Sequence, residues 1–262
     1  MTNMDASEIR EVQLDILSAV DEFCRSNGLR YYLSYGTLLG AIRHNGFIPW
    51  DDDIDITMPY PDYRWFIEEF KHDIYRVNSV MLDPDYPLHL MKVDDKRTKL
   101  VEHTYKEIDI GINIDVSPLI GLPSDKNEAI KYFNKIDFWR SKVLLAKNVV
   151  RKKRSLIKQI PIELIKALPV SRNTIIHKID DLSSRYDFDQ SQYAICVGSF
   201  NPVEEIADRT IFDSSEEHVF ENRMFSIPKG WDEWLKIMFH DYMKLPPVEK
   251  RITHHDFECY WR

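Results

Sequence analysis

The sequence contains few cysteines and no long hydrophobic run. Its 262 residues include only Cys24, Cys196 and Cys259, which are odd in number, far apart and in no CxxC pattern. We therefore expect reduced, partly buried thiols rather than disulfides or a cysteine-bound zinc ion. No stretch approaches the roughly 18 apolar residues that a membrane-spanning helix needs, and the N-terminus lacks the basic and apolar regions of a secretory signal. These absences predict a cytoplasmic protein without a membrane anchor.

Basic residues are outnumbered overall, yet one segment holds a large share of them. The chain carries 35 Lys and Arg against 43 Asp and Glu, which gives a formal net charge of −8. Between Phe138 and Ile179, eleven basic residues accompany one acid, Glu163, so this segment carries +10 and the remaining chain −18. Because basic and apolar residues can share one helical surface there, we expect peripheral contact with an anionic membrane. An ordinary solvated helical face is the open alternative, and no stacking motif indicates nucleic acid.

Hydrophobic periodicity predicts the order of helices and strands in the first part of the chain. Apolar residues at helical spacing predict a helix from Ser7, a candidate N-cap, to Gly28. A strand is expected over 29–34, followed by a glycine-punctuated turn that leads into a short helix over 35–46. Residues 53–58 alternate polar and apolar side chains, which is the pattern of a strand with one polar face.

The pattern continues along the rest of the sequence. A helix is expected over 63–73, and 111–123 alternates again, with Asn113 and Asp115 on its polar face. A helical pattern runs through 125–182. The C-terminal helix, which begins at about residue 230, is expected to stop at Pro246 and Pro247.

Four aspartates crowd the segment GFIPWDDDIDI, residues 46–56. Like charges at this density repel one another, and either protonation or a bound cation relieves the repulsion. Residues i and i+2 of a strand lie about 7 Å apart at Cα, so Asp53 and Asp55 can converge on one hard ion such as Mg²⁺. Asp51 repeats the same spacing, and Asp115 adds a further carboxylate if the two strands pair. The pattern predicts a metal site with Asp53, Asp55 and Asp115 as ligands.

The same residues carry a family resemblance. Gly36-Thr37 after a strand, Asp53-Ile-Asp55 on a strand and Asp115 on another strand resemble the nucleotidyltransferase fold. The string YGTLLGAIRHNGFIPWDDDIDI resembles the signature of the LicD family, to which phosphocholine transferases of bacterial surface polysaccharides belong and to which fukutin-related protein is distantly similar. IDVSPLIGLP and DYMKLPPVEKRITHH are similar to later motifs of that family. One departure is His240, where family members commonly have a glycine that allows a backbone conformation which histidine resists.

The resemblance implies an α/β (α+β) fold, with a nucleotidyltransferase-like mixed sheet flanked by helices and a basic helical insertion. On this interpretation the catalytic core occupies residues 1–124 and the insertion, which is the candidate membrane-facing part, occupies 125–182. Residues 183–262 then form a C-terminal part that completes the active site.

The activity implied by the resemblance is metal-dependent transfer of a phospho-alcohol, such as phosphocholine, from a CDP-linked donor to a glycan hydroxyl, with release of CMP. The glycan would be a lipid-linked precursor of lipopolysaccharide or teichoic acid, and the cofactors would be two Mg²⁺ or Mn²⁺ ions. Asp53, Asp55 and Asp115 would hold the metal ions, and Asp115 or Asp51 would accept the proton of the hydroxyl. The candidate donor-binding residues are Gly36, Thr37, Arg43, His44, Lys92, Arg251, His254 and His255.

Several alternatives stay open on the sequence alone. A DxD glycosyltransferase that uses a nucleotide sugar would also need Asp53 and Asp55, and an inactive, membrane-associated binding subunit is the non-enzymatic alternative. The segment around Lys92 is as typical of a solvated loop as of a nucleotide-binding site. For His254 and His255, a plain surface position explains the sequence as well as a contact with phosphate or acceptor does. Neither the alcohol nor the acceptor sugar is indicated by any motif.

Overall fold

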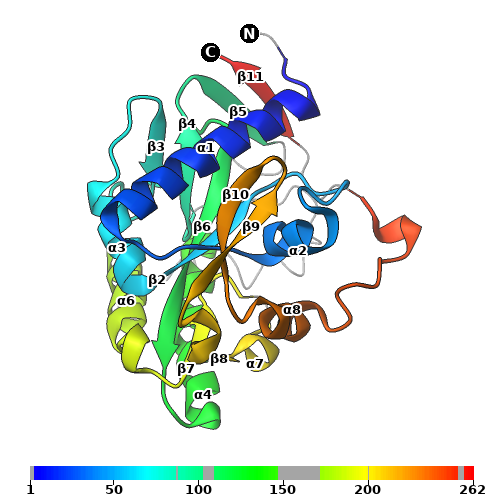
Figure 1. The fold of residues 1–262 in the computed structure, drawn as a ribbon. Coiled ribbons are helices and arrows are strands. Elements are labelled where there is room, and N and C mark those ends of the chain that lie inside the picture. The colour runs from blue at the N-terminus through cyan, green and yellow to red at the C-terminus, as the bar shows by residue number, and fades with distance from the viewer. Residues whose placement is uncertain (1–2, 87, 103–108, 147–171, 200, 253–256) are drawn as a thin grey trace.

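The computed structural model describes residues 3–86, 88–102, 109–146, 172–199, 201–252 and 257–262. A curled mixed sheet lies at the centre, with helices packed around it (Figure 1). The predicted mixed α/β fold is therefore confirmed. None of the helices in the described ranges is long and apolar enough to cross a membrane.

The central sheet is built from seven strands in the order β1-β2-β6-β4-β3, with β7 paired to β6 and β8 to β7. The pair β2–β6 is parallel, and the other pairs are antiparallel. Because β6 is the longest strand, it pairs with β4 along its first half and with β7 along its second half. The strands are β1 Tyr32–Leu33, β2 Asp55–Pro59, β3 Tyr75–Asn78, β4 Met91–Asp95, β6 Asn113–Leu122, β7 Tyr193–Cys196 and β8 Ala207–Asp208.

The first helix, α1 (Ala6–Asn27), crosses the front of the sheet in the view of Figure 1. It buries apolar residues at helical spacing and ends at Gly28, whose φ of 67° lies in the left-handed region, as the sequence predicted. The prediction that Ser7 caps this helix was wrong. Asp5 is the N-cap, because its carboxylate accepts from the backbone of Ser7 and Glu8 while the Glu8 side chain closes a capping box.

The short helix predicted within 35–46 is confirmed as α2 (Tyr35–His44), which begins at the first residue of that range without a preceding turn. The chain turns into it at Tyr35, whose φ is 42°, and leaves it at Asn45, whose φ is 57°. The glycines serve close approach: a Cβ on Gly36 would lie 2.4 Å from an Asp51 carboxylate oxygen, and one on Gly40 would lie 2.4 Å from the carbonyl oxygen of Gly46. The 46–53 loop therefore packs directly against this helix.

Two hydrophobic clusters hold the elements together. The larger packs α1, α2 and the hairpin of β9 and β10 against the sheet, and the smaller packs α4 and α6 against β6 and β7. Of the predicted insertion, the structure thus describes two helices that lie on the sheet, while 147–171 lie outside the described residues. The division of the chain into three parts remains a prediction. The elements are α3 Tyr60–Glu69, α4 Lys126–Ala146, α6 Arg172–Ser184, α7 Pro202–Glu205, β9 Ser215–Phe220 and β10 Arg223–Pro228.

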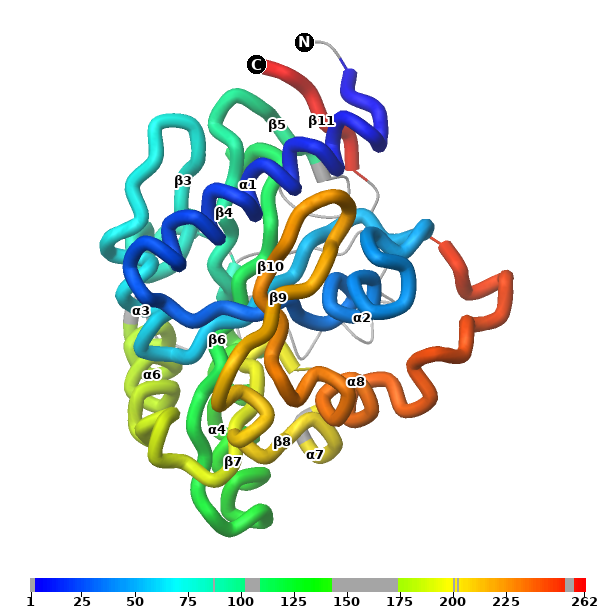
Figure 2. Tube along the Cα trace, viewed as in Figure 1, coloured from blue at the N-terminus to red at the C-terminus, as the bar shows by residue number. Residues whose placement is uncertain are grey.

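The C-terminal helix, α8 (Trp231–Phe239), ends before the predicted stop at Pro246. The chain leaves the helix at His240, whose φ of 55° and ψ of −106° explain why a glycine suits this position. The following segment swings out from α8 and returns beside the loop that follows α2 (Figure 2). The chain then ends in β11 (Phe257–Trp261), which pairs with β5 (Thr98–Glu102) as a separate two-stranded sheet.

Candidate active site

A cavity of about 690 Å³ lies where α2, the 46–53 loop, the starts of β2 and β6, and the segment after α8 meet. Its volume is within the range of small-molecule sites. Five carboxylates line it. Four of them were selected from the sequence, Asp51, Asp53, Asp55 and Asp115, and the fifth is Asp241 from the segment after α8. The cavity therefore unites the acidic motif with the later motif around Asp115.

The register of two parallel strands brings two of these acids together. Asp55 on β2 is the direct partner of Asp115 on β6. Ile54 and Ile56 alternate with the acids and are fully buried, so the carboxylates face the cavity while the apolar side chains face the core. The predicted convergence of a third acid on the Asp53/Asp55 pair is thus present in the fold. Asp53 itself precedes β2, which begins at Asp55.

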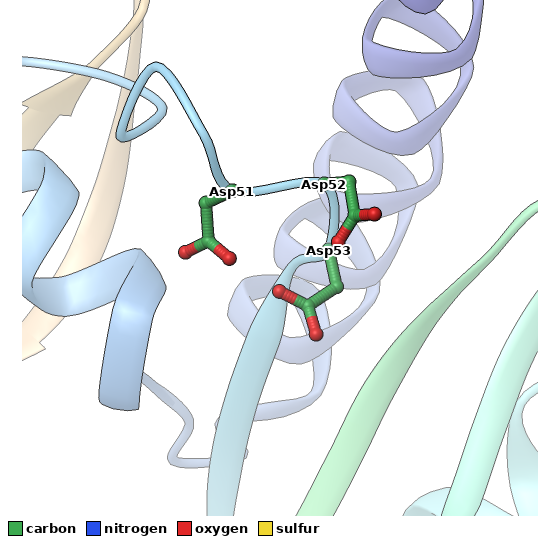
Figure 3. Close-up of side chains that lie close together, drawn as sticks. All are labelled: Asp51, Asp52 and Asp53. Atoms are coloured by element: carbon green, nitrogen blue, oxygen red, sulfur yellow. The ribbon is translucent and has the colours of Figure 1, made fainter. Parts of the chain in front are cut away.

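The loop before β2 presents three consecutive aspartates (Figure 3). One carboxylate oxygen from each of Asp51, Asp52 and Asp53 lies within 4.8 Å of the other two. Asp51 and Asp53 line the cavity, whereas Asp52 does not. Because Gly36 has no side chain, the Asp51 carboxylate can lie against α2.

The charges of this cluster repel one another. Burial, followed by the charges of Asp53 and Asp115, raises the pKa of Asp55 well above its usual range. Burial, followed by the charge of Asp53 and a hydrogen bond with it, raises the pKa of Asp51 to about 7. These acids accordingly favour either a proton or a cation. Carboxylate oxygens are the ligands that Mg²⁺ and Mn²⁺ prefer, so the donor set fits the predicted metal.

Two residues near the acids have structural contacts that the sequence did not indicate. The Thr37 hydroxyl is buried and accepts a hydrogen bond of 2.8 Å from the backbone N–H of Asp55, so it fixes the start of β2 rather than lining the cavity. Lys92 on β4 donates to Asp115 and to Asn113. Burial opposes its charge, yet the contact with Asp115 outweighs that effect and raises the pKa of Lys92.

Basic side chains also line the cavity or lie beside it. Arg43 lines it from the last turn of α2 and donates to the carbonyl oxygen of Tyr242 at 2.7 Å. Burial, followed by the nearby charge of Arg251, lowers the pKa of Arg43. Arg251 lies over the Trp50 ring, 5.4 Å from its centroid. Arg43 and His44 both lie in the last turn of α2, and His44 packs edge-on against Trp50 outside the cavity lining.

Aromatic side chains complete the cavity. Of the tyrosines near the motif, Tyr31 and Tyr32 are buried elsewhere, and Tyr35 lines the site. The other aromatic lining residues are Trp50, Phe239 and Tyr242. Aromatic faces attract quaternary ammonium groups, so this wall is suited to a choline head group.

Several lining residues were missed by reasoning from the sequence. Lys244 and Lys250 come from the segment after α8, and Ser117 and Gly198 come from β6 and the end of β7. The lysines stand inside the motif DYMKLPPVEKRITHH, which was the available signal, but nothing in the sequence placed that motif opposite the aspartates. His254 and His255 lie outside the described residues.

Comparison with known proteins extends these observations. Residues 28–116, which include the four acids selected from the sequence, match the family model for the nucleotidyltransferase domain of LicD/FKTN/FKRP. The lipopolysaccharide cholinephosphotransferase LicD of Haemophilus influenzae is 27% identical over 264 residues, which cover 96% of this chain and 97% of that protein. An uncharacterised protein of Rickettsia typhi is 37% identical over 65 residues, 24% of this chain and 21% of the other. Mannosyltransferase regulator 4 of Saccharomyces cerevisiae is 22% identical over 135 residues, 50% of this chain and 11% of that protein.

The matched domain and the alignment along nearly the whole chain agree with the geometry of the site. The family model covers α2, β2 and the start of β6, which together present the four carboxylates to one cavity. Residues 28–116 thus match the LicD/FKTN/FKRP nucleotidyltransferase domain, and the chain is similar along nearly its whole length to a LicD protein.

Proposed function

We propose that this protein transfers a phosphorylated alcohol, with phosphocholine as the preferred group, from a CDP-linked donor to a sugar hydroxyl of a cell-surface glycan precursor. The observation that carries the proposal is one cavity lined by five carboxylates, by the basic residues Arg43, Lys244 and Lys250, and by aromatic side chains. The lipopolysaccharide cholinephosphotransferase of Haemophilus influenzae is similar to this chain along almost its full length. Lipopolysaccharide and teichoic acid precursors are both acceptors of the required chemistry.

Mg²⁺ or Mn²⁺ is the cofactor that the donor set fits. Asp53, Asp55 and Asp115 would hold it, with Asp51 close to Asp53. When bound, a divalent ion neutralises diphosphate oxygens and so stabilises the attacking and leaving oxygens of an in-line displacement.

The chain's own residues position the reactants. Arg43, fixed by its bond to the Tyr242 carbonyl, is placed to bind donor phosphate oxygens, and guanidinium can do so with two parallel hydrogen bonds. The acceptor hydroxyl forms a new bond to the phosphorus of the phospho-alcohol, and the bond from that phosphorus to the bridging oxygen of CMP breaks. Asp51 or Asp115 accepts the proton of the hydroxyl, and CMP leaves with the bridging oxygen.

The aromatic wall gives the preference for choline. Tyr35, Trp50, Phe239 and Tyr242 present ring surfaces to the cavity, whereas a ribitol or glycerol group would need hydroxyl partners in the same place. Trp50 is held by Arg251 on one side, so its ring is fixed before the donor binds.

The acceptor is proposed to be lipid-linked, at the inner face of the plasma membrane. In the described part of the predicted insertion, residues 125–182, α4 and α6 form a groove of about 310 Å³. It is lined by three lysines and by apolar side chains: Lys131, Lys135, Lys178, Phe138, Trp139 and Leu182, with Asn134. Phe138 is 52% exposed. A surface of lysine and aromatic side chains is suited to an anionic leaflet.

A screen of CDP-choline, CDP-ribitol, CDP-glycerol and nucleotide sugars tests the donor class. We expect CDP-choline to raise the melting temperature and to be turned over to CMP with a divalent ion, and to do neither in excess EDTA. Asp55→Ala is expected to abolish turnover while the protein stays folded. Near-native turnover by Asp55→Ala would refute the metal assignment, and release of a nucleoside diphosphate from a nucleotide sugar would favour a glycosyltransferase.

A further inference from the structure

Three neighbouring strands place two acids and one base in a single row. Asp55 on β2 pairs directly with Asp115 on β6, and Asp115 in turn pairs directly with Lys92 on β4. Direct partners in adjacent strands project to the same face of a sheet. The row therefore reads carboxylate, carboxylate, ammonium, and its order is fixed by the register of the sheet.

The ammonium of Lys92 is held at one end of the acid cluster. It donates to a carboxylate oxygen of Asp115 and, at 2.9 Å, to the side-chain carbonyl oxygen of Asn113. Asn113 is itself fixed, because its amide donates to the carbonyl oxygen of Gly111 at 2.8 Å. Two oxygens of β6 thus converge on one positive charge, as they would on a metal ion.

The other end of the cluster is formed by Asp51 and Asp53 on the loop before β2, and both line the cavity. Asp51 and Asp53 share a hydrogen bond. Arg10 and Gln13 approach this loop and donate to its backbone carbonyl oxygens. The ion pair of Lys92 with Asp115 therefore marks one end of the cluster.

We infer that Lys92 acts as an internal cation at the Asp115 end, so that the protein without donor binds one divalent ion, at the Asp51/Asp53/Asp55 end, instead of two. The inference rests on the metal dependence in the proposed function. An ammonium in contact with Asp115 takes one of its oxygens and repels a second dication, since unit charges a few ångströms apart interact by several kcal/mol near a protein surface.

The arrangement couples the second ion to the donor. Lys92 and Asp115 are 21% and 25% exposed at their side chains, so the ammonium can leave its partner without unfolding the sheet. The diphosphate of the donor brings oxygens that accept from an ammonium and also bind a metal ion. Lys92 therefore exchanges a carboxylate partner for a phosphate partner when the donor and the second ion enter together.

The test is a calorimetric titration of the full-length, metal-free protein with Mn²⁺ in the absence of nucleotide. Wild type and Lys92→Arg, which keeps the charge, are expected to bind one ion per chain. Lys92→Met is expected to bind two, with the second at least about tenfold tighter than in wild type. Asp115→Asn added to Lys92→Met should restore a stoichiometry of one. Lys92→Gln, which keeps a hydrogen-bond donor without the charge, replaces Lys92→Met if that variant does not fold.

The outcomes separate this inference from the function on which it rests. Two ions on wild type, or one ion on both Lys92→Met and Lys92→Gln, would overturn the inference and leave the metal dependence standing. Weaker binding of the first ion by Lys92→Met would show that Lys92 only holds Asp115 in position, and this result would also overturn the inference. Absence of Mn²⁺ binding in every variant would overturn the metal assignment as well.

Discussion

His89, which directly precedes the cavity residue Leu90, is the clearest case in which one substitution should stabilise the protein. Both of its ring nitrogens are buried and have no hydrogen-bond partner among the described residues. They adjoin an enclosed cavity of about 30 Å³ whose other lining includes Tyr63, Met81 and Ile176. Burial, followed by the charge of Arg140, lowers the pKa of His89 to about 3.

Replacement by leucine removes the unpaired polar atoms and fills the same space. Leaving a buried polar group unpaired costs about 1–3 kcal/mol, so His89→Leu should gain about that amount near pH 7.5. Below its ordinary pKa the unfolded state of wild type binds a proton that the folded state refuses, so stability is lost as pH falls. Between about pH 7.5 and pH 5 this lost stability amounts to about 2 kcal/mol, which the leucine variant would not lose.

Urea unfolding of wild type, His89→Leu and His89→Gln at both pH values measures the effect. Glutamine keeps buried polar atoms but does not titrate, so it should show the flatter pH dependence without the gain near neutral pH. A leucine variant that is no more stable than the glutamine variant would refute the claim that the imidazole is unpaired. A pH slope equal to that of wild type would refute its lowered pKa.

Three further predictions concern the surroundings of the site. His240→Gly should stabilise the protein by about 1 kcal/mol, because the backbone angles of His240 cost a non-glycine residue about 1–3 kcal/mol and cost glycine little. His240→Ala keeps this strain, so equal urea midpoints for the two variants would contradict the prediction. The folded-state pKa of Asp51, about 7, lies above its unfolded value, so the metal-free protein should lose stability as pH rises from about 4 through 7. Asp51→Asn should reduce this dependence of unfolding free energy on pH. An unchanged dependence would argue against the crowding of these acids. Charge reversal at Lys131 and Lys135 should weaken co-sedimentation with anionic vesicles by about 1 kcal/mol per lysine or more, whereas the same reversal at Lys229 and Lys236 should not; equal effects of both pairs would remove the proposed membrane-facing role of α4.

The acidic half of the site was predictable because its signal is local. The alternation of Asp53 and Asp55 with Ile54 and Ile56 fixes which side chains face outward, and the structure has both isoleucines fully buried. The position of Asp115 required only that two strands with the same alternation pair with each other, which they do. Local periodicity and one assumed strand pair were enough.

The opposite half was not predictable, because it depends on contacts between distant parts of the chain. The Asp51 carboxylate approaches Gly36 so closely that a side chain at position 36 would clash with it, and the local sequence around Gly36 does not indicate this contact. Lys244 and Lys250 reach the cavity only because α8 ends at Phe239, seven residues before the first proline that the sequence offered as a stop. The bond from Arg43 to the Tyr242 carbonyl likewise spans 199 residues. Such contacts arise only when the chain has folded, so no short stretch of the sequence predicts them.

The repulsion within the acid cluster persists because the core does not allow the strands to slip. Moving β2 by one residue against β6 would turn Asp55 inward and Ile56 outward, since side chains alternate between faces. Ile54, Ile56, Ile114 and Val116 are fully buried on the core side of these strands, and their burial contributes about 6–12 kcal/mol at about 1.5–3 kcal/mol each. One pair of like charges a few ångströms apart near a protein surface costs about 4 kcal/mol. Burial of these four side chains exceeds the repulsion of one such pair, and a proton, a divalent cation or the ammonium of Lys92 lowers the repulsion among the remaining acids.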